Sequence, residues 1–234
     1  TRPDFFEFLT QLMVGGEALS ATHINRIRLR YPQLKIRNNY GPTENTIFST
    51  SFLIEKEYEN NIPIGSPITD KRAYILDDEM RVVPPQTVGL LYVAGDGLAR
   101  GYLNLTFETL QKFVPDPFFE GQRMYATGDL CRYNNDGDIE FLGRMDDQVK
   151  VRGHRIELGE IEAILRSCPH VSQAIVVYKD LGTKIKGLAA YIDHTAPDLS
   201  NIKDYIGAKL PQYMIPNYFE TIDTFPITTN GKID

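Results

Sequence analysis

The chain has 234 residues and a formal net charge of −6, with 42% hydrophobic and 24% charged residues. This length suits one large domain or two small ones, and the composition is that of a globular protein whose core needs no metal or disulfide. The acidic balance argues against a nucleic-acid surface, because such a surface needs clustered Lys and Arg.

The first fifty residues have the alternation of an α/β layer. The apolar run 12–16, ended by glycines, predicts a buried strand, and residues 20–30 predict a helix with a polar N-cap. A short strand at 34–36 leads into a polar loop over 38–44. A parallel sheet this small would have open edges, so we expect further sequence upstream.

From about residue 47 to residue 142, short β signals alternate with turn residues. The runs 72–76 and 89–94 predict strands, and residues 132–142 predict a hairpin around a polar turn. One helix is expected over 106–112. We therefore expect a small barrel or a distorted sheet.

The segment after Gly143 has a compact α+β pattern. Helices are expected at 157–167 and 201–210, and strands at 174–178, 188–192 and 218–222. The predicted organisation combines α/β and α+β parts. It comprises the end of a large α/β core subdomain (1–54), a distorted β-barrel-like subdomain (55–143) and a small, mobile α+β C-terminal lid (144–234).

The cysteines and the hydropathy pattern exclude several classes of protein. Cys131 and Cys168 are too few for a disulfide framework and lack zinc-site spacing, so we expect reduced thiols. No apolar run approaches the roughly 18 residues that span a bilayer, and the N-terminus lacks the layout of a signal peptide. These features predict a cytoplasmic protein that binds neither membrane nor nucleic acid.

The segment 38–44, Asn-Asn-Tyr-Gly-Pro-Thr-Glu, combines an aromatic ring, a turn, a hydroxyl and a carboxylate. The Tyr40 ring can stack on a nucleobase, the Thr43 hydroxyl can bind a phosphate oxygen, and Glu44 can hold Mg²⁺. Taken alone, the same residues more often form a turn with a packed tyrosine and a solvated glutamate.

Three later features carry groups suited to a nucleotide. Asp129, at an expected tight turn, can accept hydrogen bonds from ribose hydroxyls or cap its own turn. Arg144 begins a basic segment, 143–155, that suits phosphate or ribose oxygens but also fits a solvated linker. Lys232 alone is typical of a surface charge. The glycines of 95–101 are interpreted as turns, because no Lys-Ser/Thr pair follows them.

Together and in this order, the motifs closely resemble the adenylation domains of nonribosomal peptide synthetases. These domains belong to the superfamily of acyl- and aryl-CoA ligases, adenylation domains and luciferases, the AMP-binding enzymes. The resemblance covers essentially the whole chain. The motifs that carry it are GGEALS (15–20), NYGPTE (39–44), GLARGYLN (97–104), YATGDL (125–130), the segment 143–162, LPQYMIP (210–216) and NGKID (230–234).

The resemblance implies that ATP and an amino acid give an aminoacyl-AMP and pyrophosphate. The amino acid would then pass to the phosphopantetheine of a peptidyl carrier domain. It implies that Tyr40 stacks on adenine beside Asn38, that Asp129 holds the ribose with help from Arg144, and that Asp146 is a hinge. The remaining implied roles are phosphate contact for Thr43, Mg²⁺ binding for Glu44, a catalytic bridge for Lys232, and walls of the amino-acid pocket for Met13, Gly15, Asn39, Ile47 and Phe48.

The sequence also departs from that family. The Ser/Thr/Gly-rich phosphate loop is absent, Leu90 stands where Glu is common, and Ala126 stands where Arg is common. We therefore expect a partial domain that is inactive alone. Its expected partners are the missing N-terminal part and the carrier and condensation domains of the same synthetase. The alternatives are a fragment of a standalone acyl-CoA or D-alanine–carrier-protein ligase and a non-catalytic docking module. The motifs GGEALS and Tyr-Met-Ile-Pro favour the synthetase.

Overall fold

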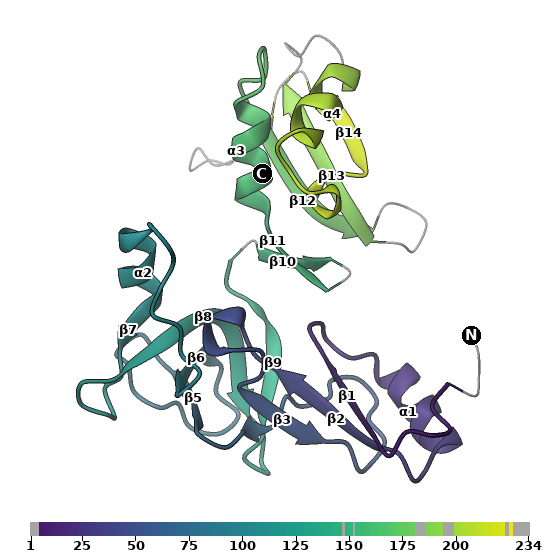
Figure 1. Ribbon diagram of the computed structural model, residues 1–234, viewed down its shortest axis with the longest axis vertical. Helices are drawn as coiled ribbons and strands as arrows, with labels where there is room; N and C mark the ends of the chain where they lie inside the picture. Colours follow the sequence, from purple (N-terminus) through teal and green to yellow (C-terminus); the bar gives the residue numbers. More distant parts are fainter. Residues whose placement is uncertain are drawn as a thin grey trace. The chain divides into compact units, whose positions relative to one another are not determined.

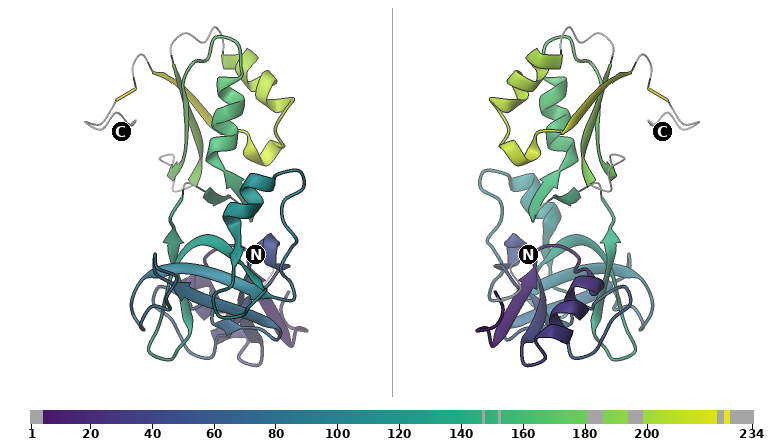
Figure 2. Two further views of the ribbon diagram at one scale, coloured as in Figure 1. Left: turned by 90° about the vertical axis from the view of Figure 1, so that its left-hand side faces the viewer. Right: turned by 90° about the vertical axis from the view of Figure 1, so that its right-hand side faces the viewer.

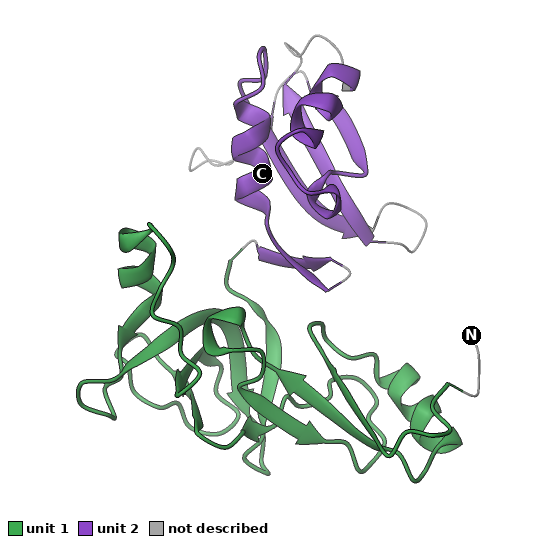
Figure 3. Cartoon of the chain, viewed as in Figure 1, with its two compact units in different colours: residues 1–146 green, residues 147–234 purple. Residues whose placement is uncertain are grey.

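The computed structural model describes residues 5–146, 148–151, 153–180, 186–193, 199–222 and 225–226. The chain divides into two compact units, residues 1–146 (unit 1) and residues 147–234 (unit 2), which are described separately below (Figure 3). The mixed α/β and α+β fold class is confirmed. The three-part division expected from the sequence stays a prediction. No helix among the described residues is long and apolar enough to cross a membrane.

Unit 1 begins with a four-stranded sheet in the order β1-β2-β3-β4 (Figure 1). Strand β1 (Gln11–Gly15) pairs in parallel with β2 (Lys35–Tyr40), which pairs antiparallel with β3 (Thr50–Leu53); β4 (Ser66–Pro67) follows. Helix α1 (Ala21–Arg30) joins β1 to β2, and Ser20 is its N-cap, as expected. Side chains of α1 and β2, among them Ile24 and Ile36, share one apolar cluster.

Two sequence expectations for this sheet are wrong. Strand β1 is not buried: its residues alternate between exposed and half-buried, because it is an edge strand that pairs only with β2 among the described residues. The polar residues from Asn38 to Tyr40 are not in a loop but complete β2, since β1 and β3 pair with them on either side. Pairing on both sides therefore overrides the weak strand propensity of asparagine.

The second sheet of unit 1 is antiparallel and has the order β5-β6-β8-β7, with β9 also paired to β8. This distorted sheet agrees with the expected fold. Its apolar core includes Ile75, Leu91, Tyr125 and Cys131. The strands are β5 (Lys71–Leu76), β6 (Gly89–Gly95), β7 (Phe113–Pro115), β8 (Arg123–Tyr133) and β9 (Ile139–Arg144), and α2 (Thr106–Lys112) precedes β7.

Strand β8 contains an irregularity that shapes the site. Between two paired positions, β6 advances from Leu90 to Tyr92 while β8 runs from Ala126 to Leu130, so β8 carries extra residues. Gly128 lies within this bulge at φ 78°, a conformation that glycine adopts without strain. The expected tight turn before a strand is therefore wrong: Asp129 lies inside β8.

Unit 2 is an α+β unit in which helices α3 (Leu158–Arg166) and α4 (Leu199–Gly207) lie on one face of a sheet (Figure 2). Ile161 and Leu165 of α3 and Ile202 of α4 pack with the inward side chains of that sheet. The sheet has the order β12-β13-β14, formed by β12 (Ala174–Asp180), β13 (Lys186–Asp193) and β14 (Tyr218–Ile222).

A hairpin precedes α3. Strands β10 (Gln148–Val151) and β11 (His154–Glu157) pair antiparallel, and Val151 and Ile156 join the core of unit 2. The interpretation of this basic segment as a solvated linker is therefore wrong. Its valine and isoleucine side chains face the core, while its charged side chains alternate with them.

Candidate functional site

The first polar cluster of unit 1 joins Tyr40, Asp129 and Arg144. The Tyr40 hydroxyl donates a hydrogen bond to Oδ2 of Asp129. The Arg144 guanidinium donates to Oδ1 of the same carboxylate at 2.7 Å, and the two side chains of this ion pair are only 11% and 6% exposed. The cluster thus places a carboxylate inside the fold with a cation and a hydroxyl as partners.

Backbone pairing explains how these side chains meet. Tyr40 is the last residue of β2, and Asp129 and Arg144 are paired across β8 and β9. The Thr127 hydroxyl donates to the Leu91 carbonyl at 2.7 Å and accepts from the Asp129 backbone amide at 3.0 Å. These bonds hold the bulge of β8 in place and direct Asp129 towards Tyr40.

Arg144 also contacts Asp146, the residue expected to be a hinge. Its Nε and Nη2 donate to the two oxygens of that carboxylate at 2.5 and 2.7 Å. This two-bond geometry uses the planar fork of arginine, which lysine cannot reproduce. Asp146 is the last residue of unit 1. The same guanidinium therefore bonds both Asp129 and the end of the unit.

Burial controls the protonation of this cluster. Burial, and then the Asp129 charge and hydrogen bond, raise the pKa of Tyr40 well above its ordinary value. Burial, and then the Asp129 charge, likewise raise the pKa of the Cys131 thiol. Tyr40 therefore stays a hydrogen-bond donor at neutral pH, and Cys131 stays a thiol.

The second polar cluster surrounds Glu44, which lies in the short helix η1 (Thr43–Asn45) and is 7% exposed. Its Oε1 accepts hydrogen bonds from the Tyr102 hydroxyl at 2.6 Å and from the Tyr125 hydroxyl at 2.7 Å. The two hydroxyl oxygens are 3.1 Å apart. Burial, and then the bond to Glu44, raise the pKa of Tyr102 well above its ordinary value.

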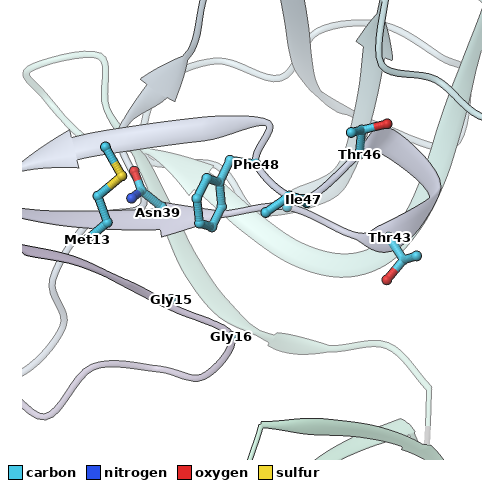
Figure 4. A pocket seen from close by; sticks show the side chains of 9 residues that line it. Met13, Gly15, Gly16, Asn39, Thr43, Thr46, Ile47 and Phe48 are labelled. Atoms are coloured by element: carbon cyan, nitrogen blue, oxygen red, sulfur yellow. The ribbon is translucent and has the colours of Figure 1, made fainter.

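A cavity of about 670 Å³ opens beside the ends of β1 and β2 (Figure 4). The Nδ2 atom of Asn39 is buried at the cavity and has no hydrogen-bond partner among the described residues. A Cβ on Gly15 would lie 2.2 Å from the Asn39 carbonyl oxygen, so only glycine fits there. The cavity is lined by Met13, Gly15, Gly16, Asn39, Gly41, Thr43, Thr46, Ile47 and Phe48.

The structure groups most of the residues singled out from the sequence. The five expected pocket residues line one cavity together with Thr43. Tyr40, Asp129 and Arg144 form one cluster, whereas the Asn38 amide donates to the carbonyls of Ile62 and Pro63 instead. Lys232 lies outside the described residues. The roles assigned to all these residues stay predictions.

Sequence reasoning missed Tyr102 and Tyr125. Both lie in quoted motifs, GLARGYLN and YATGDL, but neither motif indicates that its tyrosine reaches Glu44. Only the packing of η1 against β8 and the loop before α2 brings the hydroxyls to that carboxylate. An aromatic residue beside glycine in two separate motifs was the available signal.

The described residues contain no group of three or more His, Cys, Asp or Glu side chains that could form a metal cage. Mg²⁺ in nucleotide sites is usually held by one or two carboxylates together with the phosphates. Carboxylates that bind metals are themselves usually hydrogen-bonded by neighbouring groups. A single buried, hydrogen-bonded carboxylate such as Glu44 fits a metal carried by the nucleotide.

Comparison with known families gives two matches along the chain. The AMP-binding enzyme family matches residues 2–103, and the AMP-binding enzyme C-terminal domain matches residues 160–232. Among curated proteins, tyrocidine synthase 3 of Brevibacillus parabrevis is 48% identical over 233 residues, which cover 99% of this chain and 4% of that protein. The chain spans between 3% and 9% of the length of the curated relatives it matches.

Solved structures agree with these matches. A nonribosomal peptide synthetase protein with adenylation and PCP domains, holo-PA1221 bound to a vinylsulfonamide inhibitor, gives a TM-score of 0.86 at 32% identity, covering 100% of this chain and 40% of that one. The Vibrio cholerae adenylation domain AlmE, in complex with glycyl-adenosine-5'-phosphate, gives a TM-score of 0.82 at 26% identity, covering 96% of this chain and 43% of that one.

Proposed function

This chain belongs to the AMP-binding enzymes, with its relatives among the nonribosomal peptide synthetases, and we propose that it forms part of an amino-acid-activating adenylation domain. The proposed reaction converts ATP and an amino acid into aminoacyl-AMP and pyrophosphate. The amino acid then passes to the phosphopantetheine thiol of a peptidyl carrier domain.

One observation carries this proposal: the buried cluster of Tyr40, Asp129 and Arg144. A carboxylate offers about four acceptor sites, more than the two bonds from Tyr40 and Arg144 use, so it suits a pair of ribose hydroxyls. A buried ion pair costs desolvation energy and contributes little net stability. Its burial beside the tyrosine that we assign to adenine therefore supports a nucleotide-binding role.

In the proposed reaction, a carboxylate oxygen of the amino acid forms a bond to the α-phosphorus of ATP. The bond from that phosphorus to the bridging oxygen breaks, and pyrophosphate leaves with the electron pair. Two anions must approach each other, so positive charge is needed at the reacting oxygens. Mg²⁺ bound with ATP supplies part of this charge, and Glu44 would hold it. Lys232 is proposed to supply the rest.

The chain's own residues supply the positioning. Asp129 and Arg144 would orient the ribose, Thr43 would contact a phosphate, and the cavity at Gly15 and Asn39 would receive the amino acid. Fixing both reactants in one geometry lowers the entropic part of the barrier. We further propose that Asp146, which Arg144 bonds at the end of unit 1, is the hinge for motion of the C-terminal unit.

Amino-acid-dependent exchange of pyrophosphate into ATP tests the proposal. We expect exchange from the synthetase module that contains this chain, and none from residues 1–234 alone. In the module, Asp129→Ala and Lys232→Ala should each abolish most of the exchange, and Lys209→Ala should leave it unchanged as a control for loss of a lysine. Robust exchange by the isolated chain, or full exchange by the Asp129→Ala module, would contradict the proposal.

A further inference from the structure

The Glu44 carboxylate is oriented by two tyrosines from separate parts of unit 1. Tyr102 lies before α2 and Tyr125 lies in β8, and both hydroxyls donate to the same oxygen, Oε1. A glutamate side chain has three rotatable bonds, and two donors on one oxygen select one arrangement among its rotamers. The proposed function assigns no role to either tyrosine.

Each tyrosine is itself held rigidly. The Thr109 hydroxyl accepts from the Tyr102 backbone amide at 2.9 Å, and a Cβ on Gly101 would meet the Thr109 side chain at 2.4 Å. Tyr125 is fully buried, and the Phe113 ring packs against both tyrosine rings at centroid distances of 5.5 and 5.2 Å. The hydroxyls therefore have fixed positions relative to Glu44.

The backbone around Glu44 is anchored as well. The Ala99 amide donates to the Glu44 carbonyl at 2.8 Å, and the Lys71 ammonium donates to the Asn45 carbonyl at 2.8 Å. The main chain of η1 is thus tied to β5 and to the loop after β6. Since backbone and side chain are both constrained, the carboxylate is preorganised rather than solvated.

We propose that Tyr102 and Tyr125 are positioning residues that hold the Glu44 carboxylate for the divalent cation of a bound nucleotide. This inference rests on the proposed function, because it takes Glu44 as the group that meets the metal. Groups that orient a metal-binding side chain typically change metal affinity about 10- to 100-fold when removed. A tyrosine that only filled the core would change stability and leave metal affinity unaltered.

The test uses the synthetase module that contains this chain, with the variants Tyr102→Phe, Tyr125→Phe and Glu44→Gln. Tyr133→Phe is the matched control, because it removes a hydroxyl from the same strand that bonds the Ile75 amide and not Glu44. The readout is Mn²⁺ binding in the presence of a non-hydrolysable ATP analogue, followed by electron paramagnetic resonance. AMP binding without metal and the melting temperature are measured in parallel.

Each of the two tyrosine variants is expected to weaken Mn²⁺ binding about 10-fold, with metal-free AMP binding unchanged. In the Glu44→Gln background, the tyrosine substitutions should add no further loss, because they act through that carboxylate. Should one variant fail to fold, the other variant and this double-mutant comparison decide the question.

Two outcomes separate the inference from its premise. Mn²⁺ affinities of Tyr102→Phe and Tyr125→Phe equal to that of Tyr133→Phe would overturn the inference and leave the proposed function intact. A wild-type module that binds no nucleotide and shows no exchange would overturn the proposed function, and the inference with it.

Discussion

Replacing Arg144 by alanine is expected to destabilise unit 1 strongly. Arg144 and Asp129 form an ion pair at 2.7 Å whose side chains are 11% and 6% exposed. The substitution keeps the Asp129 carboxylate inside the fold but removes its guanidinium partner. Breaking a buried pair in this way costs more than the intact pair contributes, because the remaining charge is poorly solvated.

The size of the effect follows from the environment of the pair. Two unit charges about 4 Å apart attract by about 4 kcal/mol at an effective dielectric constant near 20. Removing one member of a buried pair typically costs about 3–5 kcal/mol. The Tyr40 hydroxyl still donates to Asp129 in the variant, so we expect the lower end, about 3 kcal/mol. With an m-value of about 2 kcal/mol/M, the urea midpoint should fall by about 1.5 M.

The assay follows unfolding of unit 1 by the reactivity of its buried thiol, Cys131, in a Cys168→Ala background. Arg132→Ala is the matched control: it breaks an ion pair to Glu140, also 2.7 Å long and between β8 and β9, but the Arg132 side chain is 39% exposed. Such a pair contributes about 0–1 kcal/mol, so its midpoint should fall by less than about 0.5 M.

The double variant Asp129→Asn, Arg144→Ala should recover part of the lost stability, since it removes the unpaired charge. Equal midpoints for Arg144→Ala and Arg132→Ala would refute the reasoning. Such a result would mean that water or another group replaces the guanidinium at no cost.

Three further predictions concern single sites. A Cβ at Gly159 of α3 meets nothing within 4 Å, so Gly159→Ala should stabilise unit 2 by about 0.5 kcal/mol in thermal unfolding. Gly15→Ala places a methyl group 2.2 Å from the Asn39 carbonyl oxygen, so it should cost about 1–3 kcal/mol and lower the melting temperature. Burial and then Asp129 raise the pKa of Cys131, so less thiolate exists at any pH below that pKa. Iodoacetamide at pH 8 should leave Cys131 unmodified until urea is added, and rapid labelling of the folded chain would contradict this.

Helices with clear local signals were predicted closely from the sequence. Residues 20–30 indicated a helix with a polar cap, and the structure has α1 from Ala21 to Arg30 with Ser20 as N-cap. The prediction for residues 218–222 matches β14. These elements were accessible because capping and apolar periodicity act within a few residues of one another.

Elements that depend on distant pairing were missed. The hairpin of β10 and β11 was hidden by its charged side chains, although Val149, Val151 and Ile156 alternate with them. The polar end of β2 was taken for a loop, because only β1 and β3 make Asn38 and Asn39 part of a sheet. In both cases the deciding hydrogen bonds come from a partner strand that local sequence does not reveal.

The site was predicted residue by residue through the family resemblance, but its contacts were not. The sequence places Tyr40 and Asp129 in separate motifs, and their hydrogen bond arises only because β2 ends beside the bulge of β8. Tyr102 and Tyr125 were missed for the same reason: their link to Glu44 crosses three elements. Motif order thus indicates which residues matter, and tertiary packing determines which of them touch.

The position of Asp129 in β8 also bears on function. Tyr125, Asp129 and Cys131 are all buried on this strand, and the first and last belong to its apolar cluster. An aspartate among such neighbours is unfavourable for folding, and the ion pair to Arg144 offsets the desolvation cost without a clear net gain. Conflicts between a local preference and the fold tend to occur at functional sites. A buried aspartate that needs both a bulge and an arginine to be accommodated is therefore better explained by a ligand than by stability.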